Sequence, residues 1–318
     1  MRPPAVIICF IVAVPLSSFT FAAEIEKGLP SRVFAPYIDL AKATGTLEQI
    51  HAASGTKYFT LAFIISGANC VPAWGGTLPV ATDMDIAKQI IDLRKAGGDV
   101  IIAFGGQAGQ ELGVTCPDVA SLQAAYQAVI DKYKVKQIDL DVEGEAIGNR
   151  ASVDRRSQAL TNLVAANPGL RISYTLAVTP GGLIPDGLTL LKNAVRHKTP
   201  IYVVNQMTMD YGVPVPAGDM ARNAISATKG TLRQLKSIGL RAKIGITPMI
   251  GMNDSPGETF SLADAQTVLK FADENKDVVL LSFWSVGRDN GSCVGTVSPL
   301  CSGVAQTNWE FSRFFNKY

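Results

Sequence analysis

The sequence predicts an α/β protein that folds as a single (β/α)8 TIM barrel. Short apolar runs rich in β-branched residues alternate along the chain with longer amphipathic stretches, which is typical of βα units around a parallel sheet. There are eight such runs, the number of strands in a closed barrel. The chain has 318 residues, 47% of them hydrophobic, and no linker or internal repeat divides it, so one large domain accounts for it.

Each predicted strand is a short apolar run, and a predicted helix follows most of them. We expect strands at residues 33–39, 58–65, 99–104, 137–142, 171–177, 202–207, 243–247 and 278–283. We expect helices at residues 84–96, 119–133, 153–166, 188–195, 221–238, 262–272 and 308–315. Such barrels carry their chemistry at the carboxyl ends of the strands, so a site is expected in the connections that follow them.

The charges and the histidines argue against several classes of function. Lys and Arg total 29 against 27 Asp and Glu, and the net charge of +2 gives no field that would attract nucleic acid or an anionic membrane. The chain has two histidines, His51 and His197, and neither has a second ligand at metal-binding spacing. We therefore expect no nucleic-acid partner, no metal and no cofactor.

The first residues have the pattern of an export signal. An apolar run over residues 5–16 is followed by small and polar residues up to Ala22, where cleavage is expected. The run is about a dozen residues long, shorter than the roughly 20 that cross a bilayer. Residues 1–22 are therefore predicted to be a signal peptide. The mature domain, residues 23–318, is expected to be secreted or periplasmic and free of the membrane after cleavage.

Four cysteines remain after this cleavage, an even number that favours two disulfides in an exported protein. Cys293 and Cys301 are close in sequence, with Gly and Pro between them, and form the favoured pair. Cys70 and Cys116 then pair by elimination. Four unpaired buried thiols are the alternative, and a zinc site is disfavoured because no C-x-x-C spacing exists.

The fourth predicted strand carries three acidic residues at alternate positions. Because side chains alternate between the faces of a strand, Asp139, Asp141 and Glu143 share one face and apolar residues share the other. In a barrel the apolar face packs under the helices, which leaves the carboxyl groups in a column facing the interior. Carboxylates this close repel each other, so at least one should hold a proton near neutral pH. A solvated acidic edge strand is the alternative, and the flanking apolar residues argue against it.

This column resembles the signature of glycoside hydrolase family 18, the family of chitinases and related endo-β-N-acetylglucosaminidases. Three more segments resemble the family, at the expected strand ends and in the expected order. They are Ala103-Phe104-Gly105-Gly106 at strand three, Met207-Thr208-Met209-Asp210-Tyr211-Gly212 at strand six and Ser282-Phe283-Trp284-Ser285 at strand eight. Together the four segments span most of the mature chain and are similar to compact bacterial chitinases.

The resemblance implies a retaining glycosidase that uses no nucleophile of its own. Glu143 would protonate the glycosidic oxygen and then activate water. Asp141 would orient the 2-acetamido group and stabilise the oxazolinium ion that forms when the acetamido carbonyl attacks the anomeric carbon. Asp139 would tune the proton shared along the column. A cationic intermediate beside carboxylates is electrostatically favourable, which supports these roles from the residues themselves.

The resemblance also implies which residues bind the sugar. Trp284 would form the apolar floor of the subsite where cleavage occurs, because a pyranose packs its C–H groups on an aromatic face. Met207 and Asp210 would line the same subsite. Tyr37 on strand one and Phe104 on strand three are further candidates for substrate binding.

Lys136 and Gln137 depart from the family pattern at the start of strand four, with structural consequences only, and two further departures bear on the site. Ala103 replaces the family's serine that hydrogen-bonds the first carboxylate, a change that bears on the sharing of the proton and on the pH optimum. The family tyrosine that hydrogen-bonds the acetamido carbonyl aligns with Met209, and Tyr211 stands two residues later on the same face. Either Tyr211 supplies this hydroxyl through a bulge near the strand end or another donor does.

The connection over residues 248–261 is too short for the α+β insertion that walls a deep tunnel in some relatives. We therefore expect an open groove and endo-acting cleavage. The resulting hypothesis is a secreted, monomeric chitinase acting on chitin or chito-oligosaccharides. The alternatives are an endo-β-N-acetylglucosaminidase acting on N-glycans and a non-catalytic chitin-binding lectin on the same barrel, although the presence of Glu143 argues against the lectin.

Overall fold

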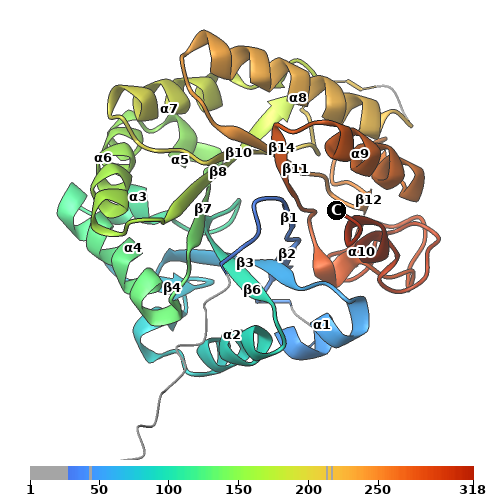
Figure 1. Cartoon of the computed structure of the whole chain (residues 1–318), viewed down its shortest axis with the longest axis horizontal. Coiled ribbons are helices and arrows are strands. Elements are labelled where there is room, and N and C mark those ends of the chain that lie inside the picture. Colours follow the sequence, from blue (N-terminus) through green and yellow to red (C-terminus); the bar gives the residue numbers. More distant parts are fainter. Residues whose placement is uncertain (1–27, 43–44, 213, 216–217) are drawn as a thin grey trace, which may run out of the picture.

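The computed structural model describes residues 28–42, 45–212, 214–215 and 218–318, which form a ring of parallel strands surrounded by helices (Figure 1). The predicted signal peptide, residues 1–22, lies outside the described residues and stays a prediction. Among the described residues, no helix combines the length and the hydropathy that crossing a membrane requires.

The ring closes through a first strand that is split in two. β1 (Val33–Phe34) pairs with β14 (Val278–Leu281), and β2 (Tyr37–Asp39) pairs with β3 (Tyr58–Ser66). Pro36 lies between the halves and has no N–H to donate to either neighbour. The ring continues from β3 through β6 (Asp99–Gly105), β7 (Gln137–Asp141), β8 (Arg171–Thr179), β10 (Val203–Met207) and β11 (Lys243–Thr247) to β14.

Short strands extend three of the strand-to-helix connections. They are β4 (Pro72–Trp74) and β5 (Leu78–Pro79) after β3, β9 (Gly182–Leu183) after β8, and β12 (Gly251–Met252) with β13 (Thr259–Phe260) after β11. The helices are α1 (Leu47–Ser54), α2 (Asp85–Lys95), α3 (Leu112–Thr115), α4 (Val119–Tyr133), α5 (Gly144–Gly148), α6 (Arg150–Ala166), α7 (Pro185–Arg196), α8 (Met220–Ser237), α9 (Leu262–Glu274) and α10 (Glu310–Phe315), with 3-10 helices η1 (Val80–Thr82) and η2 (Val286–Arg288).

The predicted fold class is confirmed, with every predicted strand close to its expected position. Helix α1 was not predicted, although its start has a sequence signal. Thr46 Oγ1 accepts a hydrogen bond from Gln49 N–H, and the Gln49 side chain accepts one from Thr46 N–H, which together form a capping box. Helix α7 begins three residues before its predicted start because Pro185 occupies its first turn, where the missing N–H costs nothing.

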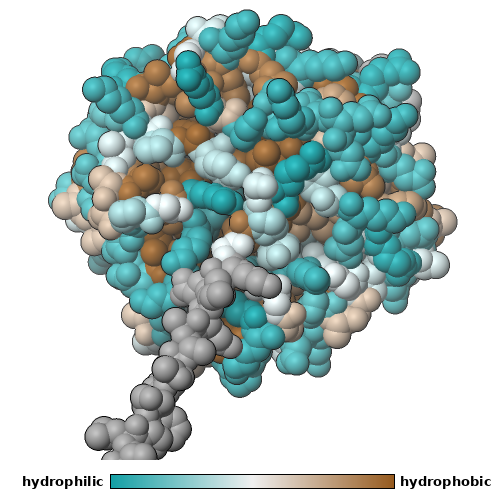
Figure 2. Space-filling view, viewed as in Figure 1, coloured by the Kyte–Doolittle hydropathy of each residue, from teal (hydrophilic) through white to brown (hydrophobic). Residues whose placement is uncertain are grey.

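The barrel strands are buried on both faces, and the two faces differ in chemistry. All residues of β6, β7 and β10 are buried. On the outer face Phe104 pairs with Leu140 and packs edge-on against Tyr126 of α4, with ring centroids 4.9 Å apart. On the inner face Ala103 pairs with Asp139. Burial of each large apolar side chain stabilises the fold by about 1.5–3 kcal/mol. The outer rim of the molecule in Figure 2 is mostly hydrophilic.

Both predicted disulfides are confirmed. Cys70, after β3, is joined to Cys116 at the end of α3, and the bond spans 46 residues of sequence. Cys293 and Cys301 close a local loop after η2, with a separation of 8.

Candidate active site

A cavity of about 880 Å³ opens at the carboxyl ends of the barrel strands. This volume lies within the range of small-molecule sites, and the position is where barrels of this kind carry their chemistry. Residues from most strand ends line it. They include Tyr37, Asp39, Phe63, Gln107, Asp141, Glu143, Ala177, Met207, Met209, Asp210, Thr247, Met249, Asp254, Trp284, Arg288, Val297, Ser298 and Pro299.

The three acidic residues Asp139, Asp141 and Glu143 lead from the interior of the barrel to this cavity. Asp139 is 1% exposed and lies beneath the cavity, whereas Asp141 and Glu143 line it. Strand β7 ends at Asp141, and Glu143 stands at the amino end of the short helix α5. The structure therefore brings the three predicted catalytic residues together, with Glu143 nearest the open cavity.

Hydroxyl groups from neighbouring strands surround Asp139. Ser173 Oγ donates to Asp139 Oδ1 at 2.6 Å, and the Tyr37 hydroxyl donates to Oδ2 at 2.9 Å. Thr175 Oγ1 lies 2.9 and 2.8 Å from the two oxygens. Asn205 Nδ2 donates to Thr175 Oγ1 at 3.0 Å, which extends the network to β10. Asp139 is thus held in place and well supplied with donors.

Asp139 receives a hydroxyl from β8, whereas Ala103 of β6 offers none. Asp139 lies between Ala103 of β6 and Ser173 of β8 in the strand register. Burial raises the pKa of Asp139 to about 6, and the hydrogen bonds from Ser173, Thr175 and Tyr37 limit this rise because they favour the charged form.

Asp141 and Glu143 lie close enough to change each other's pKa. Burial raises the pKa of Asp141 well above its usual value, and the negative charges of Glu143 and Asp139 raise it further. Burial also raises the pKa of Glu143, a hydrogen bond with Asp141 opposes that rise, and the charge of Asp210 adds to it. These directions favour a proton shared between the two carboxyl groups near neutral pH. One oxygen of Asp141, Oδ1, is buried without a hydrogen-bond partner among the described residues.

Three aromatic side chains form the apolar side of the cavity. Trp284 and Phe63 are stacked, with ring centroids 5.7 Å apart and planes 18° from parallel. The Tyr37 ring lies 6.1 Å from Trp284 and 6.0 Å from Phe63. Trp284 and Tyr37 were predicted to bind substrate and lie at the cavity, while Phe63 was not predicted. The cluster provides an apolar surface of the kind on which a sugar ring packs.

The segment after β10 places three of its residues at the cavity. Met207 ends the strand, and Met209 and Asp210 follow it into the wall. Asp210 has a φ of 43°, and its Oδ1 accepts a hydrogen bond from Ser255 N–H at 2.6 Å. The chain turns at this point, so the strand alternation ends here.

Two predicted substrate-binding residues lie away from the cavity. Phe104 was assigned to the site, but it faces the helices on the outer side of the barrel, packed on Tyr126. Tyr211 is 4% exposed, and its backbone N–H donates to Glu258 Oε1 at 3.0 Å in the turn after β10. It does not line the cavity, whereas Met209 does, and Tyr37 is the lining tyrosine among the described residues.

The hydroxyl network around Asp139 and the ring of Phe63 were not predicted from the sequence. Ser173 and Thr175 lie on another strand, and their side chains reach Asp139 only through the register of β7 and β8. Phe63 lies where the pairing of β3 with β6 shifts register, so alternation did not indicate its direction. In the part of the chain that the structure describes, no three His, Cys, Asp or Glu side chains are grouped to hold a metal ion.

Several known proteins of similar sequence and structure are described as chitinases. The chain is 36% identical to active domain 2 of a chitinase from Pyrococcus furiosus, with a TM-score of 0.82, and the match covers 91% of this chain and 95% of that one. It is 33% identical to a probable bifunctional chitinase/lysozyme of Escherichia coli K12, covering 91% of this chain and 35% of that protein. It is 32% identical to endochitinase 11 of Metarhizium anisopliae, covering 83% and 54%.

The chain thus spans about a third and about half of the length of these two curated relatives. No protein-family model matches the sequence.

Proposed function

Because the chain belongs to glycoside hydrolase family 18, we propose that it is an endo-acting chitinase that cleaves β-1,4 bonds between N-acetylglucosamine units. The observation that carries the proposal is the buried Asp141 Oδ1, which has no hydrogen-bond partner among the described residues and lies beside Glu143. An oxygen of this kind is costly unless a bound group donates to it. The N–H of a 2-acetamido group is such a donor.

Glu143 acts as the general acid in this proposal. Burial raises the pKa of Glu143, so the group retains a proton at a higher pH than a solvated glutamate. Both Glu143 and Asp141 line the cavity and Asp139 does not; Glu143 is the less buried of the two, and we assign it to the glycosidic oxygen. After the leaving group departs, the same carboxylate removes a proton from the attacking water.

In this proposal the enzyme supplies no nucleophile: the acetamido group of the substrate takes that role, and Asp141 holds it in position. The carboxyl of Asp141 holds the acetamido N–H, so that the acetamido carbonyl oxygen attacks the anomeric carbon as the glycosidic bond breaks. A positive oxazolinium ion forms, and the negative charge of the column stabilises it. Water then opens this ring at the anomeric carbon, and the product keeps the β configuration of the substrate.

The open cavity supports internal cleavage. The connection after β11 contains only the short β12–β13 hairpin, and no α+β insertion covers the cavity from this side. Trp284 and Phe63 would support the ring at the cleavage subsite. A long polymer can bind in such an open groove at an internal position, without first inserting one of its ends.

We also propose that the protein is exported and acts as a monomer on chitin or chito-oligosaccharides, without a nucleic-acid or membrane partner after cleavage of its signal. Its two disulfides are typical of an oxidising compartment. The apolar run at residues 5–16 fits a signal peptide.

The test is hydrolysis of the N-acetylglucosamine hexasaccharide, with product lengths followed from the first minutes. The wild type is expected to release products of mixed length, and Glu143→Gln is expected to bind the hexasaccharide without cleaving it. Glu145→Gln, two residues along the chain, is the matched control and should cleave normally. Early release of disaccharide alone would contradict endo action. No cleavage by the wild type, with N-linked glycans cleaved or chitin only bound, would replace the chitinase by the glycan-specific enzyme or by the lectin.

A further inference from the structure

The loop closed by the second disulfide forms one wall of the catalytic cavity. Val297, Ser298 and Pro299 line the same cavity as Asp141 and Glu143. The family motifs do not include these residues, and the disulfide between Cys293 and Cys301 holds the loop to which they belong.

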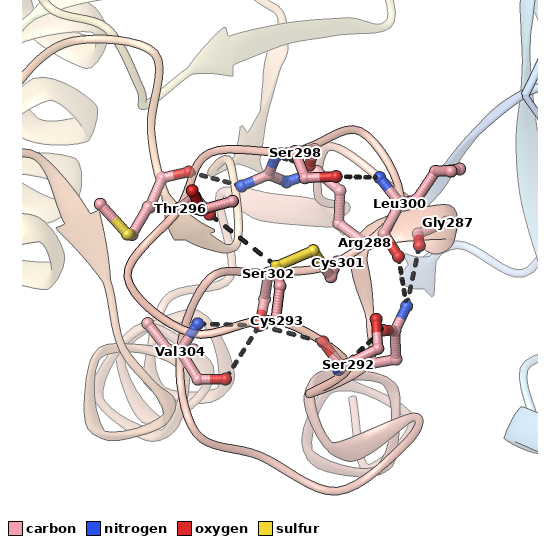
Figure 3. Close-up of a disulfide and its surroundings, with 12 residues drawn as sticks. Gly287, Arg288, Ser292, Cys293, Thr296, Ser298, Leu300, Cys301, Ser302 and Val304 are labelled. Carbon is pink, nitrogen blue, oxygen red and sulfur yellow. Dashed lines mark hydrogen bonds between the residues drawn. A yellow bond between two sulfur atoms is a disulfide. The ribbon is translucent and has the colours of Figure 1, made fainter.

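A buried arginine, Arg288, joins this loop to the neighbouring connection, the one that follows β11 (Figure 3). Arg288 is 1% exposed, and its guanidinium donates to the backbone carbonyl of Ser298. It also donates to the carbonyls of Ile250 at 3.0 Å and Met252 at 2.5 Å, which belong to the connection after β11. One side chain thus joins two connections whose residues both line the cavity.

Close backbone packing makes the two connections a single unit. Met252 N–H donates to the carbonyl of Ser302 at 2.8 Å. Gly251 has a φ of 75°, and a Cβ at this position would lie 1.9 Å from the carbonyl oxygen of Ser302. Only glycine allows this contact, so the loop is seated against β12 as a rigid wall.

The inner edge of this wall has the chemistry of a sugar-binding surface. Val297 is 43% exposed and, with Pro299, presents apolar groups to the cavity. Ser298 Oγ accepts a hydrogen bond from Leu300 N–H at 3.1 Å, so its own hydrogen can be donated to a sugar hydroxyl. Asp254 lies across on the second connection and supplies an acceptor. Apolar contact with a few placed polar groups is typical of ligand sites.

We propose that Val297, Ser298 and Pro299 form a subsite that binds a further N-acetylglucosamine unit of the chain being cleaved, next to the catalytic subsite. The inference rests on the proposed function. The ligand follows from the shared cavity. Because the loop residues and the catalytic carboxyl groups line one cavity, an oligosaccharide longer than the catalytic subsite extends along these residues.

The test compares two valines of the same loop. Val297→Ser removes an apolar group from the cavity edge, whereas Val294→Ser makes the same change at a residue that is 68% exposed and does not line the cavity. We expect Val297→Ser to lower kcat/KM for the hexasaccharide about fourfold relative to the trisaccharide, as expected for losing contact with roughly one methyl group. Val294→Ser should leave the ratio unchanged, and circular dichroism should show both variants folded.

A second variant pair tests the same wall without changing its surface. Cys293→Ala with Cys301→Ala frees the loop and should reproduce the selective loss on the hexasaccharide. Cys70→Ala with Cys116→Ala removes the disulfide away from the cavity and should not. The subsite is overturned if the ratio of kcat/KM for the hexasaccharide to that for the trisaccharide is the same in Val297→Ser, Val294→Ser and the wild type. The proposed function still stands in that case, because the hexasaccharide is cleaved. Absence of cleavage by the wild type overturns both.

Discussion

Replacing Ser173 with alanine is expected to move the acidic limb of the pH profile of kcat/KM to higher pH. Ser173 Oγ donates to Asp139 Oδ1 at 2.6 Å, and both residues are fully buried. A hydrogen bond to the charged form of an acid lowers its pKa, so its removal raises the pKa. The proposed mechanism needs an ionised Asp139 near the cationic intermediate, and activity at low pH should therefore fall.

The size of the effect follows from the contact. A hydrogen bond to a charged group contributes about 1.5–3 kcal/mol, and one pKa unit corresponds to about 1.4 kcal/mol. The pKa of Asp139, about 6 in the parent protein, should rise by about one to two units in Ser173→Ala. At pH 6 the ionised fraction of Asp139, and with it the activity, should fall by about fivefold for a rise of one unit and about fiftyfold for two, whereas activity at pH 8 should fall by no more than about twofold.

The assay is the initial rate of hexasaccharide cleavage at low substrate concentration between pH 4 and pH 9. Ser282→Ala is the matched control, because Ser282 is equally buried but its hydroxyl has no hydrogen-bond partner among the described residues. An acidic limb that stays in place in Ser173→Ala, or that moves equally in Ser282→Ala, would refute the assignment of this limb to Asp139.

Two further predictions concern stability. The pKa of Asp139 rises from 3.8 to about 6 on folding, so the ionised group destabilises the folded state by about 3 kcal/mol once the pH is well above 6. Asp139→Asn should therefore be inactive. Its free energy of unfolding in urea, relative to that of the wild type, should be about 2–3 kcal/mol higher at pH 8 than at pH 4. An equal difference from the wild type at both pH values would contradict this. Loss of the Cys70–Cys116 bond should lower the free energy of unfolding by about 4 kcal/mol and loss of Cys293–Cys301 by about 2.5, because the loops span 46 and 8 residues; the reverse order in thermal unfolding would be the opposing result.

The catalytic column could be predicted because its pattern is local. Asp139 and Asp141 alternate with apolar residues on β7, and the backbone stays extended at Glu143 before α5 begins, so the alternation places all three on one face. The disulfides could also be predicted, because four of the five cysteines lie beyond the predicted signal peptide and two of those four are only eight residues apart. The groups that tune the column were not, since Ser173 and Tyr37 approach Asp139 through the pairing of separate strands.

The two misplaced residues show where local reasoning failed. Phe104 pairs with Leu140, so it shares the outer face of the barrel, while its neighbour Ala103 faces inward with Asp139. Applying the alternation of strand four to strand three would have shown this. Tyr211 lies beyond the end of β10, and the left-handed turn at Asp210 breaks the alternation that placed it in the site. Asp is one of the few residues besides glycine that adopt this conformation readily, and Gly212 follows with a φ of 66°, so the Asp210-Tyr211-Gly212 segment was a turn signal that the alternation argument passed over.

The central claim is that the acetamido group of the substrate acts as the nucleophile, with Glu143 as the acid. The most direct test is to follow the wild type by NMR on two hexasaccharides that differ only in N-acetylation. The account predicts rapid cleavage of the acetylated chain with the β-anomer formed first, and no cleavage of the deacetylated chain. Comparable cleavage of the deacetylated chain, or initial formation of the α-anomer, would contradict it.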